Sequence, residues 1–173
     1  MKVQTWLKQN AACSEGAEWA KDKAGFKDLW DSCQRPDWML WGLARIGYTD
    51  ERKLRLYGCA CVRGTPITKG RTVWDLLSDE RSRRAVEVSE RFANGEATEE
   101  ERTAAWAAAG DAAWDAARDA SRAAAWAAAG AASGAAARDA SRTWQAEKLR
   151  ELVPWLEVEK AIRNRNRKPK GQL

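Results

Sequence analysis

The 173-residue sequence has no histidine, and phenylalanine and tyrosine occur only twice each. Without an imidazole the chain cannot form a Ser-His-Asp or Cys-His nucleophile, a histidine general base or a histidine-ligated zinc site. Tryptophan, in contrast, occurs eleven times. The enzyme classes that depend on histidine are therefore excluded, and the aromatic content of the chain is carried mainly by indole side chains.

The four cysteines do not have the spacing of a four-cysteine zinc site, because only Cys59 and Cys61 form a closely spaced pair. No apolar run approaches the roughly 18 residues of a membrane span, and the first ten residues lack the apolar run of a secretion signal. The sequence therefore predicts a cytoplasmic protein with reduced, mostly buried thiols, no metal, no cofactor and no membrane partner.

Sequence motifs for nucleotide binding and for hydrolysis are also absent. Residues 64–71 (GTPITKGR) contain two glycines and a lysine but lack the Walker order, and no G-x-S-x-G or G-x-G-x-x-G pattern occurs. Carboxylate pairs such as Asp111 and Asp115 fit a solvated helix face better than a general acid and base. We therefore predict that the protein is not an enzyme.

Apolar residues recur at helical spacing through most of the chain. Asn10 is a candidate N-cap for the first helix, and Pro36 and Gly47 mark the start and the end of a later one. Thr49 and Ser78 are candidate N-caps of two more helices, listed here with the turn that ends the second, Asn94-Gly95. No segment shows the alternation of a half-buried strand, so residues 64–71 are predicted to be a loop.

An alanine-rich segment follows Thr98, where Thr98 and Glu101 have the spacing of a capping box. Residues 104–122 realign on residues 124–142, which gives an internal repeat of 20 residues. One unbroken helix through both copies would be about 80 Å long, whereas a compact chain of this size has a radius of gyration of about 16 Å. We expect a helical hairpin, with tryptophans filling the space between alanine faces and a break at one of these positions: Gly130, Gly134, Asp119 or Ser121.

The tryptophans of the repeat cannot all lie on one side of a single helix, so at least one is expected to be exposed. An exposed tryptophan flanked by arginines has the composition of a protein-binding hot spot. The candidate partner-binding residues are Trp106, Trp114, Arg118, Arg122, Arg138 and Arg142.

The basic residues that account for the net charge of +5 lie at the end of the chain, where six lysines and arginines and no acidic residue follow Glu159. From Asn164 onward the segment is predicted to be extended. It is either a solubilising terminus or a nucleic-acid contact, although no aromatic residue follows Trp155 to stack on bases. The candidate nucleic-acid-binding residues are Arg163, Arg165, Arg167, Lys168 and Lys170.

These patterns predict an all-α fold: a single compact domain of about seven helices over residues 1–162, followed by a basic tail, 163–173. Within the domain we expect Cys/Trp-rich helices over residues 1–97, the Ala/Trp-rich helical hairpin over 98–153, and a short last helix over 154–162.

Several segments are similar to known sequences. Residues 12–20 and 29–41 (LWDSCQRPDWMLW) resemble the N-terminal part of alanine-rich helical immunity proteins that bacteria and their phages carry. Residues 53–61 and 79–87 resemble a module of bacterial proteins of unassigned function, and residues 90–98 with the repeat resemble the C-terminal half of both. The resemblance implies an all-helical, non-catalytic binder of a toxin or another defence effector.

The resemblance and the missing catalytic groups together predict a non-enzymatic inhibitor that binds and occludes a partner protein, of the immunity or phage anti-defence type. The alternative is a nucleic-acid-binding protein that acts through its basic tail. A third hypothesis is a structural or ligand-sequestering protein with a tryptophan-lined pocket. The sequence leaves open whether the chain forms a homo-oligomer.

Overall fold

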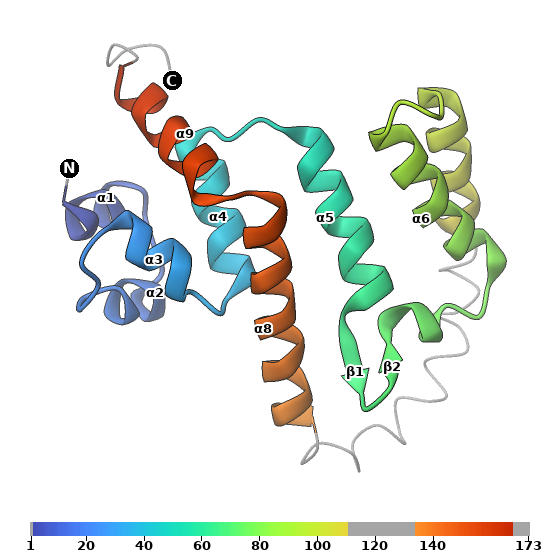
Figure 1. Cartoon of the computed structure of the whole chain (residues 1–173), viewed down its shortest axis with the longest axis horizontal. Coiled ribbons are helices and arrows are strands. Elements are labelled where there is room, and N and C mark those ends of the chain that lie inside the picture. The colour runs from blue at the N-terminus through green and yellow to red at the C-terminus, as the bar shows by residue number, and fades with distance from the viewer. Residues whose placement is uncertain (1, 111–133, 168–173) are drawn as a thin grey trace. The chain divides into compact units, whose positions relative to one another are not determined.

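The computed structural model describes residues 2–110 and 134–167 (Figure 1). These residues are mostly helical, which confirms the all-α fold class, and the number of helical segments is close to the seven expected. None of the helices in the described ranges is long and apolar enough to cross a membrane. The chain divides into two compact units: unit 1 consists of Met1–Thr49 with Ala146–Leu173, and unit 2 consists of Asp50–Gln145.

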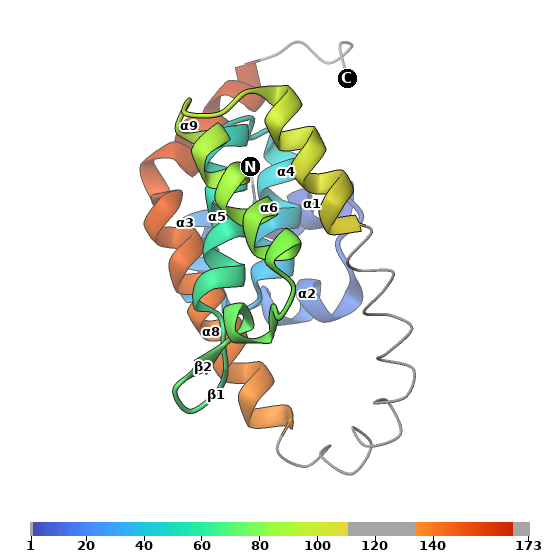
Figure 2. The same ribbon diagram turned by 90° about the vertical axis from the view of Figure 1, so that its right-hand side faces the viewer.

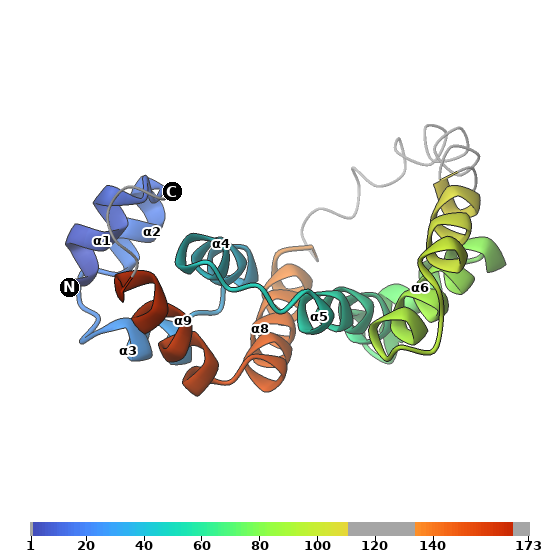
Figure 3. The ribbon, with the colours of Figure 1, turned by 90° about the horizontal axis from the view of Figure 1, so that it is seen from above.

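Unit 1 is entirely helical in its described residues. Its helices are α1 (Val3–Gln9), α2 (Ser14–Trp19), α3 (Phe26–Ser32), α4 (Pro36–Ile46), the last part of α8 (Gly134–Leu152), and α9 (Trp155–Arg167). Helix α9 packs against α3 and α4, which are close to it in Figure 3. The buried core residues include Trp6, Trp30, Met39, Leu43, Leu149, Val153 and Val158.

Local signals set most helix ends of unit 1. Pro36 is the first residue of α4, and Gly47 ends it in the left-handed conformation at φ 72°, so both predictions are confirmed. The prediction for Asn10 is wrong, because Asn10 ends α1 and its side-chain amide donates to the carbonyl of Trp6 at 2.8 Å. Cys13 caps α2 instead. Helix α1 was missed because Trp6 and Leu7 are too few apolar residues to form a periodic stripe.

Helix α9 corrects the prediction for the basic tail. Residues 164–167 were expected to be extended, whereas α9 continues through them to Arg167. Arginine is a good helix former, and cations near a helix C-terminus interact favourably with the helix dipole. The helix is further stabilised by an ion pair of 2.9 Å between Arg163 and Glu159. Lys168, Lys170 and the rest of the tail lie outside the described residues.

Unit 2 is built on two long helices, α5 (Glu51–Gly64) and α6 (Glu80–Ala93), which pack against each other (Figures 1 and 2). Their N-caps are Asp50 and Asp79, one residue after the predicted Thr49 and Ser78. The carboxylates accept from the backbone N–H groups of Lys53 at 3.0 Å and Arg81 at 2.8 Å. Each carboxylate is therefore placed to satisfy a free N–H group of the first helical turn.

The predicted loop over residues 64–71 contains a small hairpin. Strands β1 (Pro66–Thr68) and β2 (Arg71–Thr72) pair antiparallel, with Pro66 opposite Thr72 and Thr68 opposite Arg71. Gly70 in the turn has φ 76°, a conformation that glycine adopts without strain. The 3-10 helix η1 (Val73–Leu76) follows. Strands of three and two residues are too short to show an alternating pattern, which is why the sequence did not predict them.

The alanine-rich segment is helical on both sides of its middle part. Residues 99–110 form a helix, and the capping box at its start is confirmed by bonds from Thr98 N–H to the Glu101 carboxylate at 2.7 Å and from Glu101 N–H to Thr98 Oγ1 at 3.2 Å. Helix α8 begins at Gly134. The other predicted break positions lie outside the described residues: Asp119, Ser121 and Gly130.

Alanine allows close packing between α6 and the helix over residues 99–110. Ala85, Val88 and Ala105 form a buried cluster, with Ala97 and Ala109 partly buried against it. No tryptophan belongs to this cluster, and Trp106 is 62% exposed. The prediction that indoles fill the space between alanine faces is therefore wrong for Trp106.

The closest approach of a large side chain to a small one in unit 2 joins α5 to α8. A Cβ atom built on Gly64 would lie 2.7 Å from Trp144 Cη2, and closer still to its neighbour Cζ2. Beside this contact, Gln145 Nε2 donates to the buried Thr65 hydroxyl at 3.0 Å. The absence of a side chain at Gly64 therefore lets the Trp144 indole reach the backbone of α5.

We expect Gly64→Ala to lower the free energy of unfolding by about 1–3 kcal/mol, because the new methyl group overpacks against the Trp144 ring. Gly58→Ala on the same helix is the matched control, since a Cβ atom there would meet nothing within 4 Å. It should stabilise the protein by about 0.5–1 kcal/mol through helix propensity. Urea unfolding followed by circular dichroism measures both, and equal effects of the two substitutions would contradict the contact.

Candidate functional site

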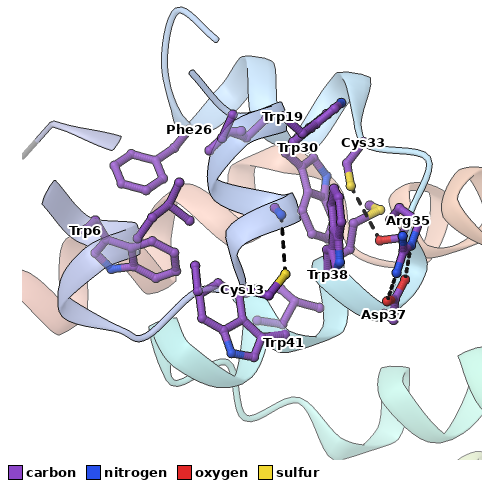
Figure 4. A pocket seen from close by; sticks show the side chains of 18 of the residues that line it. Trp6, Cys13, Trp19, Phe26, Trp30, Cys33, Arg35, Asp37, Trp38 and Trp41 are labelled. Atoms are coloured by element: carbon purple, nitrogen blue, oxygen red, sulfur yellow. Dashed lines mark hydrogen bonds and ion pairs between the residues drawn. The ribbon is translucent and has the colours of Figure 1, made fainter. Parts of the chain in front are cut away.

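Unit 1 contains a cavity of about 540 Å³, with walls from α1 to α4 and from α9 (Figure 4). Most of its lining is apolar, and its charged residues are Glu15, Arg35 and Asp37. Six aromatic side chains line it: Trp6, Trp19, Phe26, Trp30, Trp38 and Trp41. The cavity thus gathers five of the eleven tryptophans of the sequence.

The aromatic rings of the wall contact one another at steep angles. The centroid of Trp6 lies 5.5 Å from that of Phe26, at 90°, and 5.5 Å from that of Trp41, at 74°. Trp19 and Trp38 form a second pair, 5.7 Å apart and tilted by 55°. Figure 4 shows Trp6 and Phe26 on one side of the cavity and Trp30 and Trp38 on the other. Edge-to-face contacts of this kind add to the stability that burial of the rings provides.

Basic side chains lie over three of these indoles. Lys23 Nζ is 4.8 Å from the centroid of Trp19, and the guanidinium carbons of Arg35 and Arg45 are 4.4 Å and 5.8 Å from the centroids of Trp38 and Trp41. These distances are in the range of cation–π interactions. One face of each of these three rings is therefore taken by a cation of the chain itself.

The charged residues of the cavity bind one another. Arg35 donates to both carboxylate oxygens of Asp37, through Nε at 2.9 Å and Nη2 at 2.7 Å, and its Nη1 donates to Glu15 at 3.2 Å. The hydrogen bonds from Arg35 lower the pKa of Asp37, and the same bonds raise the pKa of Arg35. The carboxylates of Glu15 and Asp37 are largely exposed. The ionic groups thus lie where water reaches them and are already paired.

One polar atom in the cavity wall has no partner. The Nε1 atom of Trp30 is buried, and no acceptor among the described residues forms a hydrogen bond with it. The Trp30 residue itself is only 7% exposed. Buried N–H groups are nearly always hydrogen-bonded, and an unpaired one costs about 1–3 kcal/mol. An unpaired donor in a cavity wall is therefore a candidate ligand contact.

Arg150 holds the Trp30 side of the wall. Its Nη1 atom donates to the carbonyl oxygens of Trp30 at 3.2 Å and of Cys33 at 2.7 Å. These carbonyls lie near the C-terminus of α3, where the last C=O groups of a helix lack intrahelical partners. Arg150 therefore satisfies two carbonyls with one cation and fixes the end of α3 against the last part of α8.

Two further hydrogen bonds attach α9 to the rest of unit 1. The Tyr48 hydroxyl donates to Glu157 Oε2 at 2.8 Å, and Arg165 Nη2 donates to Asn10 Oδ1 at 2.9 Å. Val158 and Ile162, between these two anchors, line the cavity. The anchors therefore hold an apolar stretch of α9 in the wall.

Two of the four cysteines line the cavity in different environments. Cys13 is exposed and its sulfur accepts from Gly16 N–H at 3.3 Å. Cys33 is buried and donates to the carbonyl of Arg35 at 3.4 Å. Burial raises the pKa of the Cys33 thiol. Within the described residues, no group of three or more potential metal-ligating side chains lies together.

The predicted partner-binding residues lie apart from this cavity, in unit 2. Trp106 donates to Ser89 Oγ at 3.3 Å, and Arg142 pairs with Asp139 at 3.7 Å. Arg138 is exposed on α8. Trp114, Arg118 and Arg122 lie outside the described residues. The described members of the predicted set thus contact different partners, and Trp106 is the one that exposes a large apolar surface.

The predicted nucleic-acid-binding residues are divided between faces of α9. Arg163 and Arg167 are exposed and share a face with Lys160, because residues at i, i+3 and i+7 line up on a helix. Arg165 points elsewhere and is bonded to Asn10. The nucleic-acid hypothesis stays a prediction that rests on this short basic face.

The sequence did not single out the tryptophans of the cavity. The signal was present, since five of the eleven lie between Trp6 and Trp41. Helical spacing, however, indicates only that a side chain faces inward, and it does not separate a filled core from a lined cavity. Arg150 gave no signal, because its partners lie more than one hundred residues away in the chain.

Comparison with known proteins found no matching family model, no similar curated protein and no similar solved structure. The resemblance to immunity proteins therefore stays a prediction based on the quoted segments.

The raised pKa of Cys33 predicts a pH dependence of stability. The folded protein favours the neutral thiol, so the stabilisation is complete below the unfolded pKa of about 9 and is lost as the pH rises through the higher folded value. The difference in unfolding free energy between the wild type and Cys33→Ala should therefore be smaller at pH 10 than at pH 8. Urea unfolding in reducing buffer measures it, and a difference that does not change with pH would contradict the raised pKa.

Proposed function

We propose that this protein is a non-enzymatic binding protein that holds a small, apolar molecule in the aromatic cavity of unit 1. The observation that carries the proposal is the lining itself, six aromatic side chains around about 540 Å³. Small-molecule sites typically occupy about 300–1,000 Å³ and are mostly apolar, with a few polar groups that orient the ligand. The cavity agrees with that description in size and in chemistry.

The walls of the cavity are supported in a way that suits a binding site. Close-packed protein interiors contain few voids larger than a water molecule, so a space of this size is not ordinary core packing. Arg150 and Arg165 attach α8 and α9 to the N-terminal part of unit 1 by hydrogen bonds. A preformed cavity loses less free energy on binding, because its walls need little ordering.

A first test uses N-phenyl-1-naphthylamine, an uncharged aromatic probe whose fluorescence rises in apolar surroundings. We expect it to bind with a dissociation constant on the order of 10 μM. Gly42→Leu should weaken binding at least tenfold, because Gly42 lines the cavity and a Cβ atom there would meet nothing within 4 Å, which leaves room for a leucine to fill the space. The substitution should also stabilise α4 by up to about 1 kcal/mol, since glycine is unfavourable inside a helix.

Ala44→Leu is the matched control, on the same helix but exposed and outside the lining. It should leave the affinity for the probe unchanged. Absence of probe binding to the wild type, or an equal loss of affinity in the two variants, would overturn the proposed binding site.

A second candidate function is the predicted inhibition of a partner protein, a toxin or defence effector. It is favoured by Trp106, which is 62% exposed while its Nε1 atom donates to Ser89 at 3.3 Å. A large, exposed indole fixed by one hydrogen bond has the properties of an interface anchor.

Under this second function, Trp106→Ala should reduce recovery of the partner by more than about 30-fold, the equivalent of a 2 kcal/mol hot spot. Stability should fall by no more than about 1 kcal/mol, because the side chain is largely exposed. Affinity purification from the source organism, followed by titration of the purified partner, measures the effect. Leu76→Ala, also at an exposed apolar residue of unit 2, is the control, and equal recovery with both variants would exclude Trp106 as the anchor.

A further inference from the structure

We infer that the ligand of the aromatic cavity is a neutral ring compound with a carbonyl oxygen, which accepts a hydrogen bond from Trp30 Nε1. The inference rests on the proposed function, because it assigns a chemical class to the molecule that the cavity holds. It is drawn from three features of unit 1: the unpaired indole N–H, the charges around the cavity and the arrangement of the rings.

The unpaired indole N–H selects an acceptor. Trp30 is 7% exposed and lines the cavity, and its Nε1 atom is the buried side-chain polar atom of the described residues that has no hydrogen-bond partner (Figure 4). An indole nitrogen donates and does not accept. A ligand without an acceptor would bury this donor unpaired, whereas a carbonyl oxygen placed at hydrogen-bond distance would satisfy it.

The charges around the cavity disfavour an anionic ligand. Its charged residues are one arginine and two carboxylates, so they carry a net negative charge. Arg35 is engaged by both carboxylates, with contacts of 2.7 Å to Asp37 and 3.2 Å to Glu15. An anion would therefore have to break these bonds or be buried without a counter-charge, which is costly.

A cationic ligand is disfavoured by the cations already present. Tryptophan faces attract ammonium groups, and such aromatic cages do bind cationic ligands in other proteins. Here, however, Lys23, Arg35 and Arg45 lie over Trp19, Trp38 and Trp41 at 4.8, 4.4 and 5.8 Å from the ring centroids. A further cation would be repelled by these groups and by the N–H dipole of Trp30, so a neutral ligand fits best.

The arrangement of the rings favours a flat, cyclic ligand. Trp6 presents its ring at 90° to Phe26 and at 74° to Trp41, so the wall offers both ring faces and ring edges. Cyclic molecules can stack on the faces and contact the edges at low cost in conformational entropy, because they have few rotatable bonds.

The test compares 1-indanone with indane, which have the same fused rings and differ in the carbonyl group. Isothermal titration gives the affinity of each probe for the wild type, Trp30→Phe and Trp38→Phe. We expect the ratio of indanone affinity to indane affinity to fall about tenfold in Trp30→Phe, the value of one buried hydrogen bond, and to stay unchanged in Trp38→Phe. Because only ratios are compared, the different hydrophobicity of the two probes cancels.

An unchanged ratio in Trp30→Phe would overturn the inference, and so would the failure of both indane probes to bind a wild-type protein that binds N-phenyl-1-naphthylamine. Failure of the naphthylamine itself would overturn the proposed function. If Trp30→Phe does not fold, the wild type labelled with ¹⁵N at tryptophan gives a second measurement. There, 1-indanone should move the Trp30 indole proton downfield and indane should not, and a resonance that responds equally to both probes would overturn the inference.

Discussion

The bonds from Arg150 to the end of α3 are the constraint on which the candidate site depends. A helix that ends inside a protein leaves carbonyl oxygens without intrahelical partners, and these must be bonded or lose stability. One guanidinium nitrogen meets this requirement for both Trp30 and Cys33. The same contact fixes the backbone of Trp30, and therefore fixes the indole whose N–H group faces no acceptor of the described residues. The proposed specificity of the cavity thus depends on a bond made by the backbone of the residue that confers it.

The two units use small residues for different purposes. In unit 2, Gly64 removes a side chain so that Trp144 can approach the backbone, and Ala85 and Ala105 allow two helices to come close. In unit 1 the indoles pack mainly against one another, and Gly42 leaves space instead of filling it. Close packing of small against large residues therefore explains the structure of unit 2, whereas aromatic contacts around a retained space explain unit 1.

The absence of histidine and the pairing of Arg35 with its carboxylates have the same chemical consequence. The cavity has donors, ring faces and apolar surface, but its ionic groups are engaged and its Cys33 thiol is buried with a raised pKa. Such a lining is suited to recognise a neutral molecule and to exclude water from it. The proposal of a binding protein without catalytic residues follows from this combination.

The sequence by itself determined the features that depend on neighbouring residues. The helical class, the start of α4 at Pro36, its end at Gly47 and the capping box at Thr98 are local, because each rests on backbone groups within a few positions of the residue concerned. Asn10 was misassigned since its side chain can serve either end of a helix, and short strands carry too few residues for a pattern.

Only the tertiary structure decided which tryptophans enclose a space and which are exposed. Trp6 and Trp106 have the same side chain, yet the first is buried in an aromatic cluster and the second is 62% exposed. That difference depends on contacts between residues far apart in the chain, such as Arg150 with Cys33 and Arg165 with Asn10. Spacing along one helix cannot encode such contacts, because it specifies which way a side chain faces and not what it meets.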